Sequence, residues 1–157
     1  MSPIKPLYRV LAPLILMGTL LAAPPLHAGD DGMQVVASDH DVATTADRLV
    51  SILEDKGMTV YARIDHAAGA VEADMELAPT QLVIFGNPHI GTRLMQCDRR
   101  AGIDLPVKVL IWEDKDGVHL GYNSAKYLAK RHDLRTCGTA LGRIAHAIAS
   151  FVHNAAR

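Results

Sequence analysis

An aspartate and a histidine stand side by side in this chain, as Asp65 and His66, directly after a segment in which apolar and polar residues alternate. The carboxylate of Asp65 could orient or charge the imidazole of His66, which would give a general base or a metal-ligating pair. Alternatively, Asp65 caps a helix that begins near Ala67, and His66 is a turn residue. An enzyme that uses the Asp65–His66 pair is therefore one hypothesis.

Two further polar residues stand at turns between apolar segments. Asn87 lies in the run Gly86–His89, which reads as a strand-to-helix turn whose backbone N–H groups could face an anion. This run has one glycine, so the Gly-rich signature of a phosphate loop is absent. Asp104 stands two residues before Pro106 and is either a turn former or a carboxylate that lines a pocket. If the domain binds a small molecule, we expect one cleft to be formed by Asp65, His66, Asn87 and Asp104.

Metal binding requires several donors that converge on one point. No HxxxH, HxH, MxxM or CxxC pair occurs in the sequence. His146 and His153 fall on one helix face, but seven residues at a rise of about 1.5 Å place them about 10 Å apart. His66, His89 and Met95 could suit copper if the fold brings them together. Copper handling is therefore a second hypothesis, and no motif predicts a cofactor.

The first 28 residues have the three parts of a cleavable secretory signal peptide. Lys5 and Arg9 form a positively charged start, an apolar stretch covers Val10–Ala23, and the segment ends on a small residue, Ala28. The apolar stretch is shorter than the roughly 20 residues that a membrane-spanning helix needs, although an uncleaved anchor is the alternative. We expect cleavage after Ala28 and export by the general secretory route to a bacterial periplasm, with no membrane attachment afterwards.

Charge and aromatic content argue against binding of nucleic acid. Two of the 16 basic residues lie in the leader, so residues 29–157 have 14 basic and 17 acidic residues and no basic tail. Proteins that bind nucleic acid instead cluster Lys and Arg to displace counterions. Two Phe, one Trp and four Tyr are also too few for a base-stacking platform. The length of residues 29–157 is typical of a single domain with one hydrophobic core.

The elements that must position the polar residues alternate between strands and helices. The sequence predicts strands at about 33–37, 59–65, 81–85, 107–113 and 118–123, and the last two form a hairpin across the turn at 114–117. Apolar and polar residues alternate in 59–65 and 118–123, whereas 81–85 is a more fully buried run. Helical spacing predicts helices from Asp41 or Thr44 to Gly57, and at about 89–98, 124–131 and 139–155, with a short one possible within 67–75. The order β-α-β-β-α-β-β-α-α favours a two-layer α+β domain with a mainly antiparallel sheet and helices on one face.

The chain has two cysteines, Cys97 and Cys137. Two cysteines in an exported protein more often form a bridge than two free thiols. We therefore expect a Cys97–Cys137 disulfide, which would tie the segment near the end of the predicted 89–98 helix to the start of the last helix.

Several motifs, taken together, resemble a known family. They are Ala62–Ala68 (ARIDHAA), Phe85–Pro88 (FGNP), Gly91–Thr92, Asp104–Pro106 (DLP) and Ile111–Asp114 (IWED). In this order and spacing the chain is similar, over about residues 35–151, to the bacterial domain-of-unknown-function family 302 (DUF302). The resemblance implies a compact α+β fold, similar in outline to the sheet-and-helix plan of the TATA-box-binding protein, and a homodimer. It implies no reaction.

One departure from the family pattern limits what the resemblance implies. Many relatives have a cysteine just before the Asn-Pro pair and another just after the Leu-Pro pair, where this chain has Gly86 and Val107. Thiol chemistry tied to that pair is therefore not expected here. The leading hypothesis is a dimeric, non-enzymatic periplasmic binding or accessory domain with a possible small-molecule ligand, and copper handling and an enzyme are the alternatives.

Overall fold

The computed structural model describes residues 32–157, and the predicted signal peptide, residues 1–28, lies outside this range. The strands are β1 (Met33–Ser38), β2 (Thr59–Asp65), β3 (Thr80–Gly86), β4 (Val107–Asp114) and β5 (Gly117–Asn123). The α-helices are α1 (Val42–Asp55), α2 (His66–Glu72), α3 (Pro88–Cys97), α4 (Ala125–His132) and α5 (Gly138–Ala155). Two short 3₁₀ helices are η1 (Arg99–Ile103) and η2 (Leu134–Cys137).

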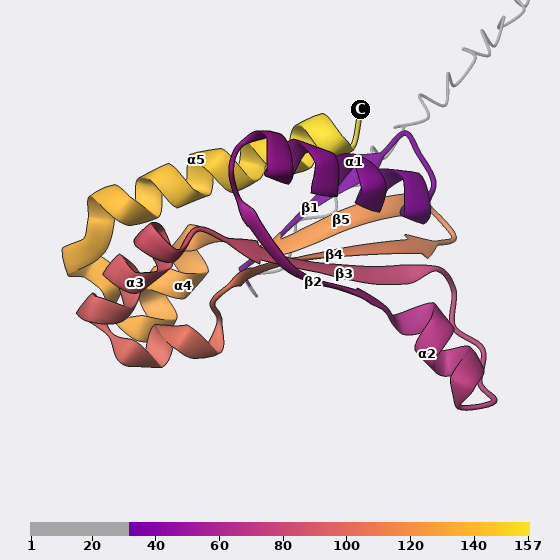
Figure 1. The fold of residues 1–157 in the computed structure, drawn as a ribbon, viewed down its shortest axis with the longest axis horizontal. Coiled ribbons are helices and arrows are strands. Elements are labelled where there is room, and N and C mark those ends of the chain that lie inside the picture. The colour runs from indigo at the N-terminus through magenta and orange to yellow at the C-terminus, as the bar shows by residue number, and fades with distance from the viewer. Residues whose placement is uncertain (1–31) are drawn as a thin grey trace, which may run out of the picture.

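The strands form one sheet in the order β1-β5-β4-β3-β2, and every neighbouring pair is antiparallel. β1 and β2 lie at opposite edges, so α1, which connects them, crosses the sheet. Helices α1 and α5 lie side by side over the same face of the sheet, whereas α3 and α4 lie at one end and α2 at the other (Figure 1). The predicted two-layer α+β class with an antiparallel sheet is therefore confirmed.

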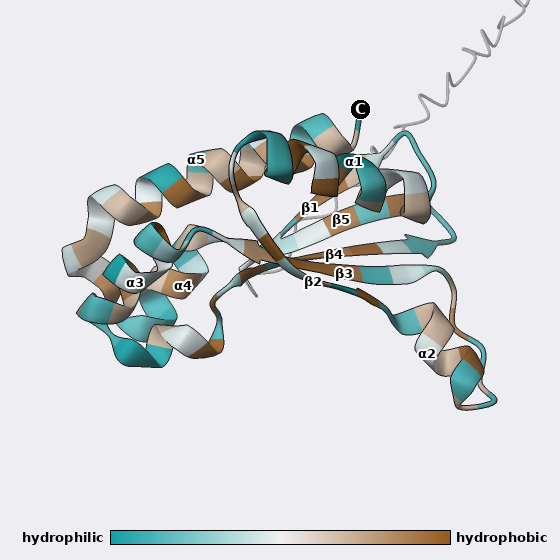
Figure 2. Ribbon diagram, in the orientation of Figure 1, coloured by the Kyte–Doolittle hydropathy of each residue, from teal (hydrophilic) through white to brown (hydrophobic). Residues whose placement is uncertain are grey.

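The core lies between the sheet and the pair α1 and α5. Val83 pairs with Val109 and Ile111 pairs with Leu120, and all four side chains are fully buried. Partners in an antiparallel pair lie on the same face, so these residues define the face that the helices cover. Figure 2 shows the same pattern as apolar colour along the middle of β3 and β4 and on the side of α1 that meets the sheet.

Local signals account for most helix boundaries. Asp41 caps α1, because its Oδ1 accepts a hydrogen bond from the Thr44 backbone N–H at 2.7 Å. Of the two predicted starts, Asp41 is therefore right and Thr44 is wrong. Gly57 follows α1 with φ at +67°, in the left-handed region that favours glycine. The predicted hairpin is also confirmed, since Asp114 pairs with Gly117 at its tip.

Candidate functional site

The pairing of β2 with β3 separates the predicted site residues into two groups. Thr59 pairs with Gly86 and Asp65 pairs with Gln81. Asn87 therefore follows β3 at one end of the sheet, whereas Asp65 ends β2 at the other. Five residues of strand at a rise of about 3.4 Å put these ends about 17 Å apart. The expectation that Asp65 and His66 share one cleft with Asn87 and Asp104 is wrong.

Asp65 has a structural role at the far end of the sheet. Its Oδ1 accepts a hydrogen bond from the backbone N–H of Ala68 at 2.9 Å, which caps α2, and its Oδ2 accepts one from Gln81 Nε2 at 3.1 Å. Both Asp65 and His66 are exposed. Since the described contacts of the carboxylate include none to the His66 ring, the capping alternative holds and no oriented Asp–His pair is formed.

Asp104 is engaged in a partly buried ion-pair cluster. Its Oδ2 is in hydrogen-bond contact with Nε2 of His132, whose side chain is only 5% exposed, and lies 3.3 Å from Nε of Arg131. A hydrogen bond to the Tyr127 hydroxyl, and secondly the negative charge of Asp104, raise the pKa of Arg131 above its usual value. The cluster joins the turn before β4 to α4, so Asp104 holds two elements together.

Asn87 is the predicted site residue that meets a cavity. Its Oδ1 accepts a hydrogen bond from the His89 backbone N–H at 2.9 Å, so it is the N-cap of α3. Beside it, a cavity of about 270 Å³ lies between α3, α5 and the adjacent ends of the sheet strands. Most of its lining is apolar and includes Met58, Phe85, Met95, Val107, Ile148 and Phe151. Its polar members are Tyr61, Asn87, Thr92 and Arg143.

A second, more polar groove of about 610 Å³ adjoins the cavity, and the two share Asn87, Ile90 and Arg143. Arg93 and His89 also line the groove. Among the described residues, no Asp or Glu lines the cavity or the groove, and no hydrogen bond or ion pair is formed by the guanidinium groups of Arg93 and Arg143. The two adjoining spaces therefore differ in character, one apolar and the other cationic.

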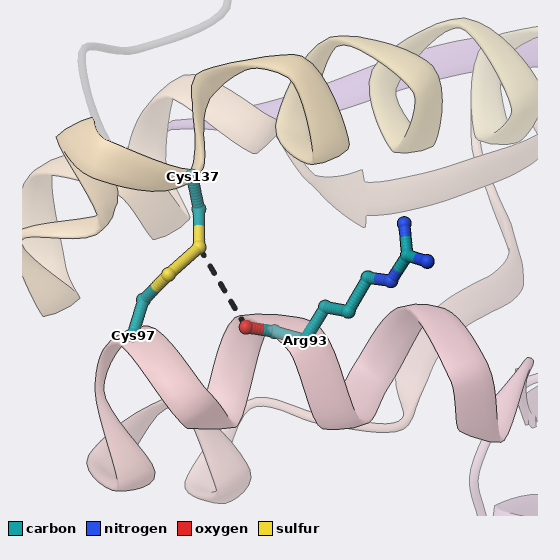
Figure 3. Close-up of a disulfide and its surroundings, with 3 residues drawn as sticks. All are labelled: Arg93, Cys97 and Cys137. Carbon is teal, nitrogen blue, oxygen red and sulfur yellow. Dashed lines mark hydrogen bonds between the residues drawn. A yellow bond between two sulfur atoms is a disulfide. The ribbon is translucent and has the colours of Figure 1, made fainter.

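The predicted disulfide is present and forms part of the groove wall. Cys97 ends α3 and Cys137 immediately precedes α5, with their Cα atoms 6.6 Å apart. Cys137 Sγ lies 3.6 Å from the backbone oxygen of Arg93, a packing contact because a disulfide sulfur carries no hydrogen. In Figure 3 the Arg93 side chain extends away from the disulfide along α3 and beneath α5. The bridge thus holds the start of α5 against the end of α3.

The donors proposed for copper are not brought together. His66 begins α2 at the far end of the sheet, His89 lines the groove and Met95 lines the cavity. Within residues 32–157, no group of three or more His, Cys, Asp or Glu side chains is placed to hold a metal ion.

Sequence reasoning missed the cationic residues of this region. The position of Arg143 could have been recognised from the sequence, because Ala147 and Phe151 follow it at intervals of four residues and Ile144 is its neighbour. This spacing places Arg143 on the same helix face as Ala147 and Phe151. Arg93 carried no such signal, since its neighbourhood depends on where α5 packs.

Comparisons with known proteins identify relatives but no reaction for this chain. The family described as domain of unknown function DUF302 matches residues 34–151. The fluoride-specific ion channel FluC 1 of Brucella suis biovar 1 (strain 1330) is 49% identical over 106 residues, which is 67% of this chain and 42% of that protein. FluC 1 of Brucella abortus biovar 1 (strain 9-941) is also 49% identical over 106 residues, 39% of its length. This chain therefore spans about two fifths of the curated relatives it matches.

A solved structure has the same fold. The crystal structure of an uncharacterized conserved DUF302 protein from Bacillus stearothermophilus superposes with a TM-score of 0.63 at 18% identity, over 80% of this chain and 95% of that one. In this chain, no helix within residues 32–157 is long and apolar enough to cross a membrane.

The structural role of Asp104 can be tested by unfolding in urea. Asp104→Ala leaves the buried ring nitrogen of His132 without its partner, so we expect the free energy of unfolding to fall by about 1–3 kcal/mol. Asp65→Ala removes an exposed helix cap and an exposed hydrogen bond from Gln81, and should cost about 1 kcal/mol. Asp104→Asn keeps an acceptor oxygen and serves as the matched control. Equal stability of wild type and Asp104→Ala would contradict this role.

Proposed function

We propose that this chain, which belongs to the DUF302 family, is an exported accessory domain that binds a small molecule and catalyses no reaction of its own. The observation that carries the proposal is the apolar cavity of about 270 Å³ between α3 and α5. Ligand sites in proteins are mostly apolar hollows with a few polar groups that fix the orientation of the ligand. Here Tyr61, Asn87 and Arg143 are such groups.

The lining of the cavity supports binding rather than catalysis. Among the described residues that line it there is no His, Asp, Glu, Cys, Ser or Lys. These side chains supply most general acids, general bases and nucleophiles. His66 lies at the far end of the sheet, and His89 lines the adjoining groove rather than the cavity itself.

The accessory role is supported by the relatives named as fluoride-specific ion channels. A channel needs segments that cross the membrane, and the described part of this chain has no helix able to do so. We infer that the shared segment is an additional part of those longer proteins and that the fluoride activity in their names belongs to the remainder. The role that we assign to this chain is therefore that of an accessory domain that acts beside a membrane protein, or binds the substrate of one, and does not itself form a pore.

A homodimer is the second part of the proposal, with the uncovered sheet face as its interface. The face opposite α1 and α5 carries alternate strand residues, which the register assigns as Val35, Ile64, Leu82, Ile84, Leu110 and Trp112. Val35 is 43% exposed and Ile64 is 39% exposed. Burial of this apolar area against a partner would stabilise a dimer, because the area is then removed from water.

The charges of this face favour a second copy of the chain. Lys108 and Asp114 lie on it at opposite ends of β4, the central strand. A two-fold axis that runs in the plane of the face and across the strands would place Lys108 over Asp114 of the partner subunit, twice in the dimer. Such a self-complementary arrangement is what a two-fold interface requires.

Export is the third part of the proposal and is supported by the leader and by the disulfide. Residues 1–28 have the pattern of a cleavable signal peptide. Disulfides persist in oxidising compartments such as the periplasm and are rare in the cytosol. A Cys97–Cys137 bridge therefore agrees with a periplasmic location.

Binding in the cavity can be tested with the neutral fluorescent probe N-phenyl-1-naphthylamine. Gly91 precedes Met95 by one helical turn and lines the cavity with it, and a Cβ added at Gly91 would meet no atom within 4 Å. We expect saturable binding by the wild type and at least a tenfold loss in Gly91→Phe. Gly142→Phe, in an equally open position outside both linings, is the control. Absence of binding by the wild type would refute the proposal.

The dimer can be tested by light scattering at tens of micromolar protein. The wild type should have twice the mass of one chain, and Leu110→Glu, which puts a charge at the centre of the uncovered face, should be monomeric. Val71→Glu is the control, because Val71 is 72% exposed on α2, away from this face. A monomeric wild type would overturn the proposal.

Export can be tested by mass spectrometry of protein from the periplasmic fraction. The expected mass is that of a chain that begins at Gly29 and lacks the two thiol hydrogens of Cys97 and Cys137. Because these cysteines form a disulfide, we expect alkylation only after reduction. A membrane-bound form that retains Met1, or two thiols that react without reduction, would contradict the proposal.

A further inference from the structure

The apolar cavity opens into a space of opposite character. Arg143 lines both the cavity of about 270 Å³ and the adjoining groove of about 610 Å³. Asn87 and Ile90 are the other residues that the two spaces share. A ligand seated in the cavity would therefore reach Arg143, which lines both spaces.

The groove has positive charge that nothing in its described lining offsets. Arg93 and Arg143 both line it, neither guanidinium has a described hydrogen-bond or ion-pair partner, and no described carboxylate lines the groove. Two like charges on one groove repel each other, and an anion between them removes that cost. The location is notable because residues 29–157 as a whole carry more acidic than basic residues.

The other polar groups of the groove suit the same kind of ligand. Thr136 and Thr139 contribute hydroxyl groups, which can donate hydrogen bonds. Guanidinium groups are the side chains best suited to planar anions, because two parallel N–H groups match the two oxygens of a carboxylate. Charge and geometry thus point to an anionic head group at the two arginines.

The volume of the cavity limits the apolar part of the ligand. Pockets for drug-sized molecules span about 300–1,000 Å³, and the cavity, at about 270 Å³, lies just below this range. One short alkyl chain or one small ring system is therefore a better match than a lipid with two long acyl chains.

We propose that the ligand is a small amphipathic carboxylate, with its apolar body in the cavity and its carboxylate between Arg143 and Arg93. This inference rests on the proposed binding function and adds the chemical class of the ligand. The apolar body supplies affinity through burial, and the two arginines supply selectivity for the anionic head.

Calorimetric titration with decanoate and with 1-decanol, two probes of equal chain length, tests the proposal. We expect decanoate to bind at least tenfold more tightly than 1-decanol to the wild type. Arg143→Gln should remove most of this difference by weakening decanoate and leaving 1-decanol unchanged, and Arg93→Gln should have a smaller effect in the same direction. Arg99→Gln is the matched control, since Arg99 is an exposed arginine of η1 that lines neither space.

The possible outcomes separate this inference from the proposed function. Equal binding of both probes, or decanoate binding that survives Arg143→Gln and Arg93→Gln together, would overturn the carboxylate assignment and leave the cavity as a neutral binding site. Decanoate binding that persists in Gly91→Phe would place the site outside the cavity and overturn the assignment as well. Absence of binding by either probe, together with no binding of N-phenyl-1-naphthylamine, would refute both proposals.

Discussion

The packing of α5 across the sheet is the constraint on which the cavity and the adjoining groove depend. Near its C-terminal end Val152 and Ala155 are fully buried in the core that α5 shares with α1. An α-helix of 18 residues is about 27 Å long, and the N-terminal part of α5 continues beyond α1, over α3 and α4 (Figure 1). Phe151 of this helix meets Phe85 of β3 edge to face, with ring centroids 6.4 Å apart, and both rings line the cavity.

The start of α5 is held to α3 by a covalent bond as well as by packing. The disulfide ties it to the end of α3 and closes a loop of 40 residues, a constraint on the unfolded chain of about 4 kcal/mol in the chain-entropy account. The Asp104–His132 contact similarly fastens to α4 the turn before β4, whose Leu105 and Pro106 line the cavity. Two fixed walls make a binding site largely preformed, so less binding free energy is lost in ordering it.

The fold could be predicted from the sequence because its signals are local, whereas the site depends on pairing between distant segments. The hairpin turn, the apolar stripe of α5 and the two cysteines are readable from short windows. Asp65 ends one strand and Asn87 follows the next, and this much was predicted correctly. Neighbouring strands in an antiparallel sheet run in opposite directions, however, so residues that follow consecutive strands lie at opposite ends. The arginines were missed because α3 and α5 are distant in the chain and meet only in the tertiary structure.

The two surfaces with proposed partners lie on different sides of the sheet, and this separation bears on how such a domain could serve a larger protein. The cavity is on the helix-covered side, and the apolar strand residues such as Leu110 face the other way. A dimer formed through the uncovered face would leave both cavities accessible to ligand. In relatives that carry additional sequence, the same arrangement would let the domain pair two chains while each copy still binds its own small molecule. The sheet then separates the dimer interface from the ligand-binding cavity. Substitutions that abolish dimerisation should therefore leave ligand binding intact, and substitutions that abolish ligand binding should leave the dimer intact.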